Sequence, residues 1–304
     1  MKIGLPVFGY QNFPTMAQYI KERGFFTANL GDNMQSIAVR MLLKKLGLED
    51  EEIVSIDRDE MRDYSGPPAA LIMNGVFYDW CFPISGKITP IFIGFHATEA
   101  TIAKHKHFFA QHQPIGCRDC TTAEHFAKHG ITAYVTGCLT LTIPRRQSSP
   151  SSGKVLVVYG GLSGTGVGDF PASALHRMPA PYFDDLEFVY QRLPLTEHPL
   201  NQSRRLEVET YALSLLRYYA DHAKLVITTL HHAAAPCMAL GIPVIICRHA
   251  MDPRFSFLSE IVPIHTAGNF DAIDWAPTAA NIEPVRQQLE ALVAQSVRAV
   301  HSRT

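Results

Sequence analysis

The sequence has little net charge and no long hydrophobic run. Its 27 Lys and Arg residues nearly balance its 28 Asp and Glu residues, which leaves a formal net charge of -1. A chain with this balance has no long-range positive field, so we expect neither nucleic acid nor an anionic membrane surface as a partner. Its apolar runs stay well short of the roughly 20 residues of a transmembrane helix, although peripheral membrane association stays open. Any anionic ligand must therefore be held by local contacts.

An export signal and a disulfide framework are also missing. Residues 1–9 contain one cation and too few apolar residues for a signal peptide, so we expect a cytoplasmic protein. Six cysteines in 304 residues are then typical of reduced thiols. Cys117 and Cys120 have the C-x-x-C spacing, but no second pair completes the four ligands of structural zinc, so we expect no metal site. Four other cysteines lie among apolar neighbours and are predicted to be core residues: Cys81, Cys138, Cys237 and Cys247.

The chain is long enough for two hydrophobic cores. It has 304 residues, of which 47% are hydrophobic, and this length is typical of about two domains. Residues 144–153 are polar and rich in Pro and Ser, so they can bury almost nothing. We therefore predict an N-terminal domain over residues 1–147 and a C-terminal domain over residues 153–304.

Strand patterns alternate with helical patterns in both predicted domains, which is typical of parallel sheets flanked by helices. The sequence therefore predicts an α/β protein whose two Rossmann-like domains, with mostly parallel sheets, face a central cleft. Ligands of such sheets bind beyond the carboxyl ends of the strands. The final predicted helix could pack against either domain. Strands are expected at residues 52–56, 69–73, 90–94, 115–117, 133–136, 154–159, 186–190, 225–228 and 243–247, and helices at residues 33–46, 121–129, 204–222, 232–240 and 282–300.

Two junctions in the first half place polar residues at the start of a helix. Asp32 or Asn33 could simply cap the helix there, while Asn29, Asp32 and Gln35 could instead bind an acceptor hydroxyl. Arg118 follows a short strand and precedes a helix start, where the helix dipole opposes a cation unless an anion compensates it. A guanidinium suits carboxylate or phosphate recognition, so Arg118 is a candidate for binding an anion, with a structural salt bridge as the alternative.

Two junctions in the second half could also contact an anion. Residues 160–168 form a glycine-rich loop after a predicted strand, in which Gly160, Gly161, Ser163 and Gly164 could bind a donor, although the P-loop lysine is missing. His231 and His232 follow the strand at 225–228 and open a helix. A helix N-terminus lowers the pKa of a nearby histidine, which keeps it available as a base. Adjacent helical residues do not share a face, so we expect only one of the two imidazoles to reach the cleft.

Taken together, these junctions resemble the sequence blocks of the polysaccharide pyruvyl transferase family over most of the chain. The similar segments are residues 29–32 with Gln35 (family N-x-G-D), residues 114–119 and 137–142 (G-x-R-D and G-C-x-T-L), residues 226–244 (V-I-T-S-R-L-H-A-A, then P-x-x-A-L-G-x-P-V) and residues 274–277 (W-x-P). The resemblance implies a GT-B-like fold and transfer of pyruvate from phosphoenolpyruvate onto a hexose as a ketal. The acceptor would be a hexose-containing glycan or a lipid-linked oligosaccharide precursor of a surface polysaccharide, and no cofactor is implied.

The resemblance also assigns roles to individual residues. It places Arg118 on the family's arginine and His232, rather than His231, on its histidine, which makes both catalytic candidates. Arg254 stands where the family has a cation, so Arg118 and Arg254 would hold the donor. The family's usual arginine is replaced by Leu230. That departure leaves two alternatives open: a GT-B-type glycosyltransferase that uses a nucleotide sugar, and a non-catalytic glycan-binding paralogue.

Overall fold

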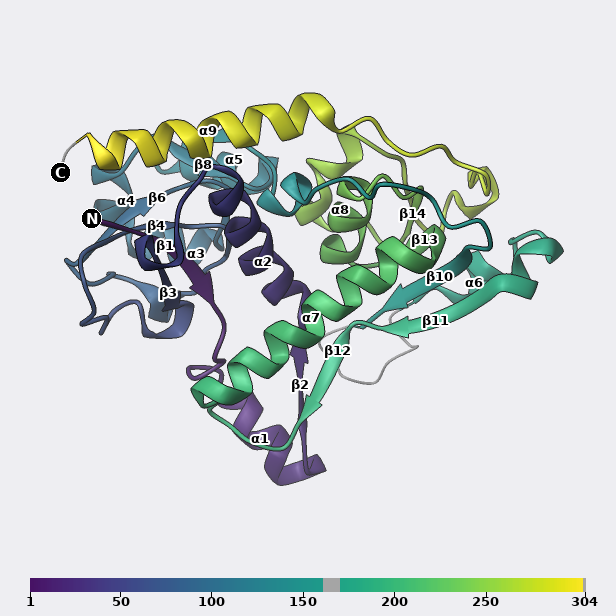
Figure 1. Ribbon diagram of the computed structural model, residues 1–304, viewed down its shortest axis with the longest axis horizontal. Coiled ribbons are helices and arrows are strands. Elements are labelled where there is room, and N and C mark those ends of the chain that lie inside the picture. The colour runs from purple at the N-terminus through teal and green to yellow at the C-terminus, as the bar shows by residue number, and fades with distance from the viewer. Residues whose placement is uncertain (161–169, 303–304) are drawn as a thin grey trace.

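The computed structural model describes residues 1–160 and 170–302 of the chain. Helices cover sheets whose strands run mostly in parallel (Figure 1). This arrangement confirms the predicted α/β class, in which apolar strands are buried between helical layers. Within these two described ranges, no helix is long and apolar enough to cross a membrane.

The N-terminal half contains two four-stranded parallel sheets. The first has the order β3-β1-β4-β6 and the second has the order β5-β7-β8-β9. Because β5 closely follows β4 and β7 closely follows β6 in the sequence, the same two chain segments run through both sheets. The strands are β1 (Lys2–Val7), β3 (Ile53–Asp57), β4 (Ala69–Ile72), β5 (Gly75–Val76), β6 (Ile88–Ile91), β7 (Phe95–His96), β8 (Ile115–Cys117) and β9 (Ala133–Val135).

The C-terminal half contains a five-stranded parallel sheet with the order β11-β10-β13-β14-β15. In this sheet and in the first one, the strand that comes first in sequence lies second in space. The next strand in the sequence is therefore added on one side of β1 or β10, and the strands after it are added on the other side. Ligands bind at such reversals of strand order. The strands are β10 (Lys154–Tyr159), β11 (Leu186–Tyr190), β13 (Ala223–Thr228), β14 (Val244–Cys247) and β15 (Ile264–His265).

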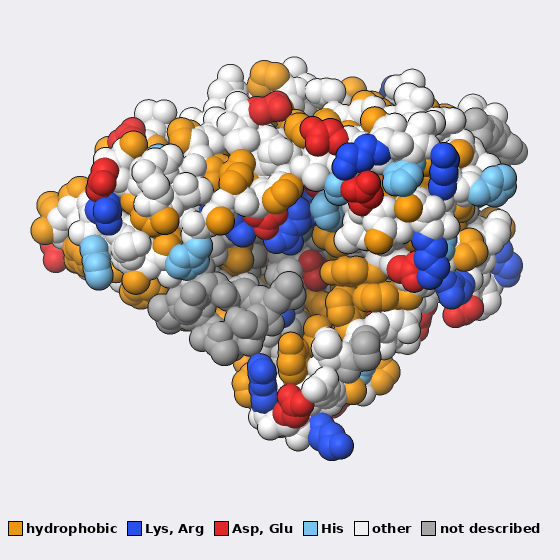
Figure 2. Space-filling model, turned by 180° about the vertical axis from the view of Figure 1, so that it is seen from behind, with side chains coloured by type: hydrophobic (Ala, Val, Ile, Leu, Met, Phe, Trp, Pro, Cys, Tyr) orange, Lys and Arg blue, Asp and Glu red, His pale blue; other side chains and the backbone are white. Residues whose placement is uncertain are grey.

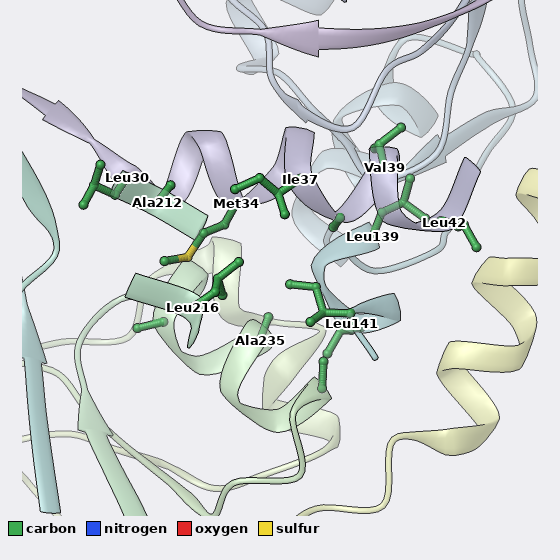
Figure 3. Close-up of a cluster of buried hydrophobic side chains, with 14 of the residues drawn as sticks. Leu30, Met34, Ile37, Val39, Leu42, Leu139, Leu141, Ala212, Leu216 and Ala235 are labelled. Carbon is green, nitrogen blue, oxygen red and sulfur yellow. The ribbon is translucent and has the colours of Figure 1, made fainter. Parts of the chain in front are cut away.

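An antiparallel pair joins the two halves. β2 (Phe26–Asn29) pairs with β12 (Arg192–Leu195), and Asn29 lies opposite Arg192. Directly after β2, helix α2 (Leu30–Lys45) packs against α7 (Gln202–His222) and α8 (His231–Ala239). Figure 3 shows side chains of these three helices in one buried cluster, together with Leu139 and Leu141. The two halves therefore share a hydrophobic core.

The last helix extends over both halves. α9 (Glu283–His301) runs along the top of the molecule in Figure 1. Arg286 donates hydrogen bonds to the carbonyl oxygens of Leu141 and Ala239, while Glu290 pairs with Lys45 at 2.6 Å. The remaining helices are α1 (Pro14–Arg23), α3 (Glu99–Lys104), α4 (Lys106–Gln111), α5 (Cys120–Lys128) and α6 (Ala172–Leu175).

The polar segment at residues 144–153 contains neither helix nor strand, in agreement with the sequence pattern. It is nevertheless held against the second half, because Arg146 donates to the carbonyl oxygen of Ala223 at 2.6 Å. The division into domains at this segment stays a prediction, since the shared core links the two halves.

Candidate functional site

A cleft of about 650 Å³ lies where strands of both halves end, and its volume is ordinary for a small-molecule site. Tyr10 follows β1, Gly160 follows β10, and His231 and His232 follow β13; all four line the cleft. These are the chain reversals of the two sheets, as expected for ligand sites of this fold. The face drawn in Figure 2 is hollowed near its centre, with basic side chains above the hollow and hydrophobic ones beside it.

Arg118 lines the cleft between β8 and α5, and its side chain is 2% exposed. Asp119 Oδ2 lies 3.8 Å from its Nε, but that carboxylate has other partners. Asp119 caps α5, because its Oδ1 accepts a hydrogen bond from the backbone nitrogen of Thr122 at 2.9 Å. Its Oδ2 lies 2.7 Å from His96 Nδ1. The buried Nε of Arg118 has no hydrogen-bond partner in the described chain. Little in this geometry supports a structural salt bridge, so the guanidinium is available to a ligand.

Two further arginines line the cleft after β14. Arg254 makes its closest contact with Asp252, at 2.6 Å from Nη2 to Oδ2. Arg248 Nη2 lies 3.1 Å from the same oxygen, and its guanidinium lies 4.5 Å from the ring centroid of Phe255. The single carboxylate of Asp252 thus contacts two guanidinium groups, so this part of the cleft keeps a net positive charge.

Both histidines line the cleft, so the prediction that only one of them reaches it is wrong. His232 has φ -88° and ψ 15°, which is not helical, and the helical argument for opposite faces therefore does not apply. The two rings lie 4.9 Å apart in an edge-on arrangement. His232 Nε2 lies 3.9 Å from the sulfur of Cys138, whereas neither ring nitrogen of His231 has a partner among the described residues.

The histidines are held in the neutral form. Burial lowers the pKa of His231 and of His232 well below the ordinary value, and the positive charges of Arg118 and Arg254 lower it further. The direction agrees with the sequence-based expectation, although burial, rather than a helix N-terminus, is the larger cause. Near pH 7 both imidazoles are therefore able to accept a proton.

The start of α2 differs from the predicted capping. Asn29, rather than Asp32 or Asn33, is the N-cap, because its Oδ1 accepts from the backbone nitrogen of Gly31 at 3.1 Å. Asn29 and Asp32 line the cleft, and Asp32 accepts hydrogen bonds from Asn29 Nδ2 at 3.0 Å and from the Tyr10 hydroxyl at 3.4 Å. Burial raises the pKa of Asp32. Gln35 is fully buried, its polar atoms have no partner in the described chain, and it is not among the described residues lining the cleft.

The predicted glycine-rich loop is described only at its first residue. Gly160 lines the cleft with φ +145°, a conformation that favours glycine. Gly161, Ser163 and Gly164 lie outside the described residues.

The cysteines take up different surroundings. Cys117 donates to the carbonyl oxygen of Ile115, whereas Cys120 Sγ lies 3.8 Å from Glu260. Over residues 1–160 and 170–302, no group of three or more His, Cys, Asp or Glu side chains is placed to hold a metal ion. The four cysteines predicted to be core residues are buried: Cys81, Cys138, Cys237 and Cys247.

Comparison with known families bears directly on this cleft. The sequence profile of the polysaccharide pyruvyl transferase family matches residues 29–250, a range that includes Asn29, Arg118 and His232. The chain belongs to this family. This match confirms the resemblance that the sequence blocks predicted.

Other comparisons are more distant. No curated protein matches this pyruvyl transferase family member. A functionally uncharacterized protein from Klebsiella pneumoniae is 12% identical with a TM-score of 0.43, covering 75% of this chain and 84% of its own. A putative UDP-N-acetylglucosamine 2-epimerase from Listeria monocytogenes is 13% identical with a TM-score of 0.37, covering 97% of this chain and 91% of its own. Neither similarity is close enough to bear on activity.

Sequence reasoning missed several cleft residues of this family member. Arg248 could have been found by the rule that led to the histidines, because it directly follows the predicted strand at 243–247. Arg192 is buried beside Thr27, and that contact depends on the unpredicted pairing of β2 with β12. An uncharged wall was also missed, because its residues are dispersed in the sequence: Tyr10, Phe13, Met16, Val76 and Tyr78.

Gly31 of this family member has no space for a side chain. A Cβ added there would lie 2.7 Å from the Cβ of His232 and 3.1 Å from Gln191 Nε2. We expect Gly31→Ala to lower the free energy of unfolding by about 1–3 kcal/mol, because the starts of α2 and α8 must move apart. Denaturant unfolding checks this, with Gly86→Ala as the control, since a Cβ there meets nothing within 4 Å. Equal stability of the two variants would contradict the packing argument.

Proposed function

We propose that this protein transfers pyruvate from phosphoenolpyruvate onto a hexose of a glycan or lipid-linked precursor, as a ketal, in the cytoplasm. The observation that carries the proposal is the buried guanidinium of Arg118, whose Nε has no hydrogen-bond partner among the described residues, beside Arg248 and Arg254 in one cleft. Phosphoenolpyruvate carries about three negative charges on a small frame, counting one carboxylate and one phosphate. Clustered arginines suit that ligand because guanidinium groups bind carboxylates and phosphates through paired hydrogen bonds.

The reaction requires proton transfers at defined atoms. A proton added to C3 of phosphoenolpyruvate forms the methyl group and makes C2 electrophilic. One hexose hydroxyl then forms a C2–O bond, and a second hydroxyl forms another as the bond from C2 to the phosphate oxygen breaks. Each hydroxyl loses its proton, and inorganic phosphate leaves. The two hydroxyls release two protons. One of these makes up for the proton added to C3 and the other goes to the leaving phosphate, so the reaction balances without a cofactor.

We assign these transfers to two side chains. His232 lines the same cleft as Arg118 and the other donor-binding candidates. Its imidazole can take up a proton and then deliver it to C3. Asp32 lines the cleft with a pKa raised by burial, so its carboxylate can accept a hydroxyl proton from the acceptor. Asn29 would help to hold the acceptor there. Gln35 is too deeply placed to contact it directly.

A nucleotide-sugar donor is the second candidate function. Gly160 lines the cleft in a glycine-specific conformation, which is compatible with backbone contacts to a diphosphate. Leu230 also lines the cleft at the position where an arginine was expected. In that case the protein would be a glycosyltransferase, and Arg118 would contact the diphosphate.

A melting experiment separates these functions. A ligand that binds only the folded protein adds about 2.7 kcal/mol of stability at a hundredfold excess over its dissociation constant. We expect phosphoenolpyruvate to raise the melting temperature, with a smaller rise in Arg254→Ala, and we expect nucleotide sugars to have little effect. A rise with nucleotide sugars alone would replace our proposal with the glycosyltransferase. No rise with any donor, in the presence of a hexoside, would favour a non-catalytic glycan-binding protein.

A further inference from the structure

One wall of the cleft is uncharged. Its residues Tyr10, Phe13, Met16, Val76 and Tyr78 carry no charge at neutral pH. The arginines and histidines assigned to the donor are contributed by other segments, after β8, β13 and β14. The faces of aromatic rings carry partial negative charge, so an anionic donor is disfavoured against them. The cleft therefore offers two chemically different surfaces.

The aromatic rings of this wall are fixed by one another. Tyr78 and Trp80 stack with centroids 4.6 Å apart and planes inclined by 14°. Phe13 meets both rings edge-on, at 5.1 Å from each. Trp80 is anchored in turn by a hydrogen bond from its Nε1 to Asp59, at 3.1 Å. Stacked and edge-on pairs are the favoured arrangements of aromatic rings, so this cluster forms a preorganised surface.

A buried cation supports the cluster from the protein interior. The guanidinium of Arg58 lies 5.2 Å from the ring centroid of Phe13 and 5.1 Å from that of Tyr78. Arg58 is only 1% exposed, and it is held by Asp59 at 3.1 Å and by the carbonyl oxygen of Val76 at 3.2 Å. It therefore contributes cation–π attraction that helps to fix the two rings, both of which line the cleft.

We propose that Phe13 and Tyr78 form a stacking subsite for an uncharged hexopyranose ring of the acceptor. The identification of this ring as the acceptor rests on the proposed function. A pyranose presents C–H groups on its face and hydroxyls around its edge, so it can pack on an aromatic ring and still make polar contacts. Asp32 and the hydroxyl of Tyr10 lie at the same cleft and provide such contacts. The aromatic wall thus selects a neutral sugar, and the arginines select the anionic donor.

Tryptophan fluorescence tests this subsite without requiring turnover. The sequence contains two tryptophans, so Trp275→Phe leaves Trp80, which stacks on Tyr78, as the reporter. We expect uncharged methyl hexopyranosides to change its emission saturably. Tyr78→Phe should preserve this response, whereas Tyr78→Leu, which keeps apolar bulk without a ring, should weaken the apparent affinity about tenfold or more. Tyr211→Ala on α7, where the residue is 49% exposed and away from the cleft lining, is the matched control and should respond like the parent.

Steady-state kinetics provides the second readout. In Tyr78→Leu we expect the acceptor KM to rise about tenfold, equivalent to about 1.4 kcal/mol, while the phosphoenolpyruvate KM stays unchanged. An unaltered acceptor KM together with an unresponsive Trp80 would overturn the subsite. If hexosides bind with the predicted pattern but no pyruvate is transferred, the sugar subsite stands and the proposed reaction falls. Equal rises in both KM values would assign Tyr78 to general cleft structure and would also overturn the proposal.

Discussion

Arg118→Ala is expected to weaken phosphoenolpyruvate binding about 30-fold and to leave the fold intact. A charge-assisted contact contributes on the order of 2 kcal/mol, which corresponds to that factor in the dissociation constant. The fold should survive because the Nε of Arg118 has no partner among the described residues, so its removal breaks little. Asp119 keeps the hydrogen bond from Thr122 and its contact with His96. Titration calorimetry with phosphoenolpyruvate measures the loss of affinity.

Two variants define what the loss of Arg118 means. Arg118→Lys keeps a positive charge without the planar fork, and it should recover only part of the affinity. Arg204→Ala removes an arginine that pairs with Glu207 on α7, outside the cleft lining, and it should bind the donor normally. If Arg118→Ala melts well below the parent protein while its folded fraction binds phosphoenolpyruvate as before, Arg118 is a structural residue and the donor assignment is wrong.

The main strands could be predicted because their apolar runs are uninterrupted. β10 and β14 contain several consecutive buried aliphatic residues, and each was predicted within about one residue of its observed bounds. β1 was missed because Gly4 and Pro6 interrupt its pattern, although it lies at the centre of the first sheet. The pairing of β2 with β12 joins Asn29 to Arg192 across the chain, and no local pattern reports a contact of that range.

The cleft could be predicted where one rule sufficed. Looking just after strands identified Arg118 and the pair His231 and His232. The family resemblance then selected His232 and added Arg254, and Arg118, His232 and Arg254 all line the same cleft. The expectation that only one of the two imidazoles reaches the cleft failed because it assumed regular helical geometry, whereas His232 has a non-helical backbone. The rule itself failed for the aromatic wall, because Phe13 and Tyr78 meet only after the segments around β1 and β5 have come together.

His232→Ala is expected to reduce turnover by about 10²–10⁴-fold, with a much smaller effect for His231→Ala. The physical reason is the proton that must reach C3 of the donor. In the free protein, burial lowers the pKa of His232, and the charges of Arg118 and Arg254 lower it further. The negative charges of a bound donor offset those of the arginines, so binding should raise the pKa of His232 toward neutrality. The imidazole would then gain a proton at the stage when the reaction needs one.

Proton uptake makes this role measurable apart from the rate. Calorimetric titration with phosphoenolpyruvate near pH 6.5, repeated in buffers of different ionisation enthalpy, should show net uptake of protons by the parent protein. His232→Gln, which keeps a polar side chain but does not titrate in this range, should lose most of that uptake, and unfolding experiments should show a stability close to that of the parent. His231→Gln should retain it. Equal losses of uptake and turnover in the two variants, at equal stability, would show that the proton is shared by both imidazoles. In that case the assignment of the proton donor to His232 alone is wrong. The two imidazoles, whose ring centroids lie 4.9 Å apart, would then act together as a coupled proton donor.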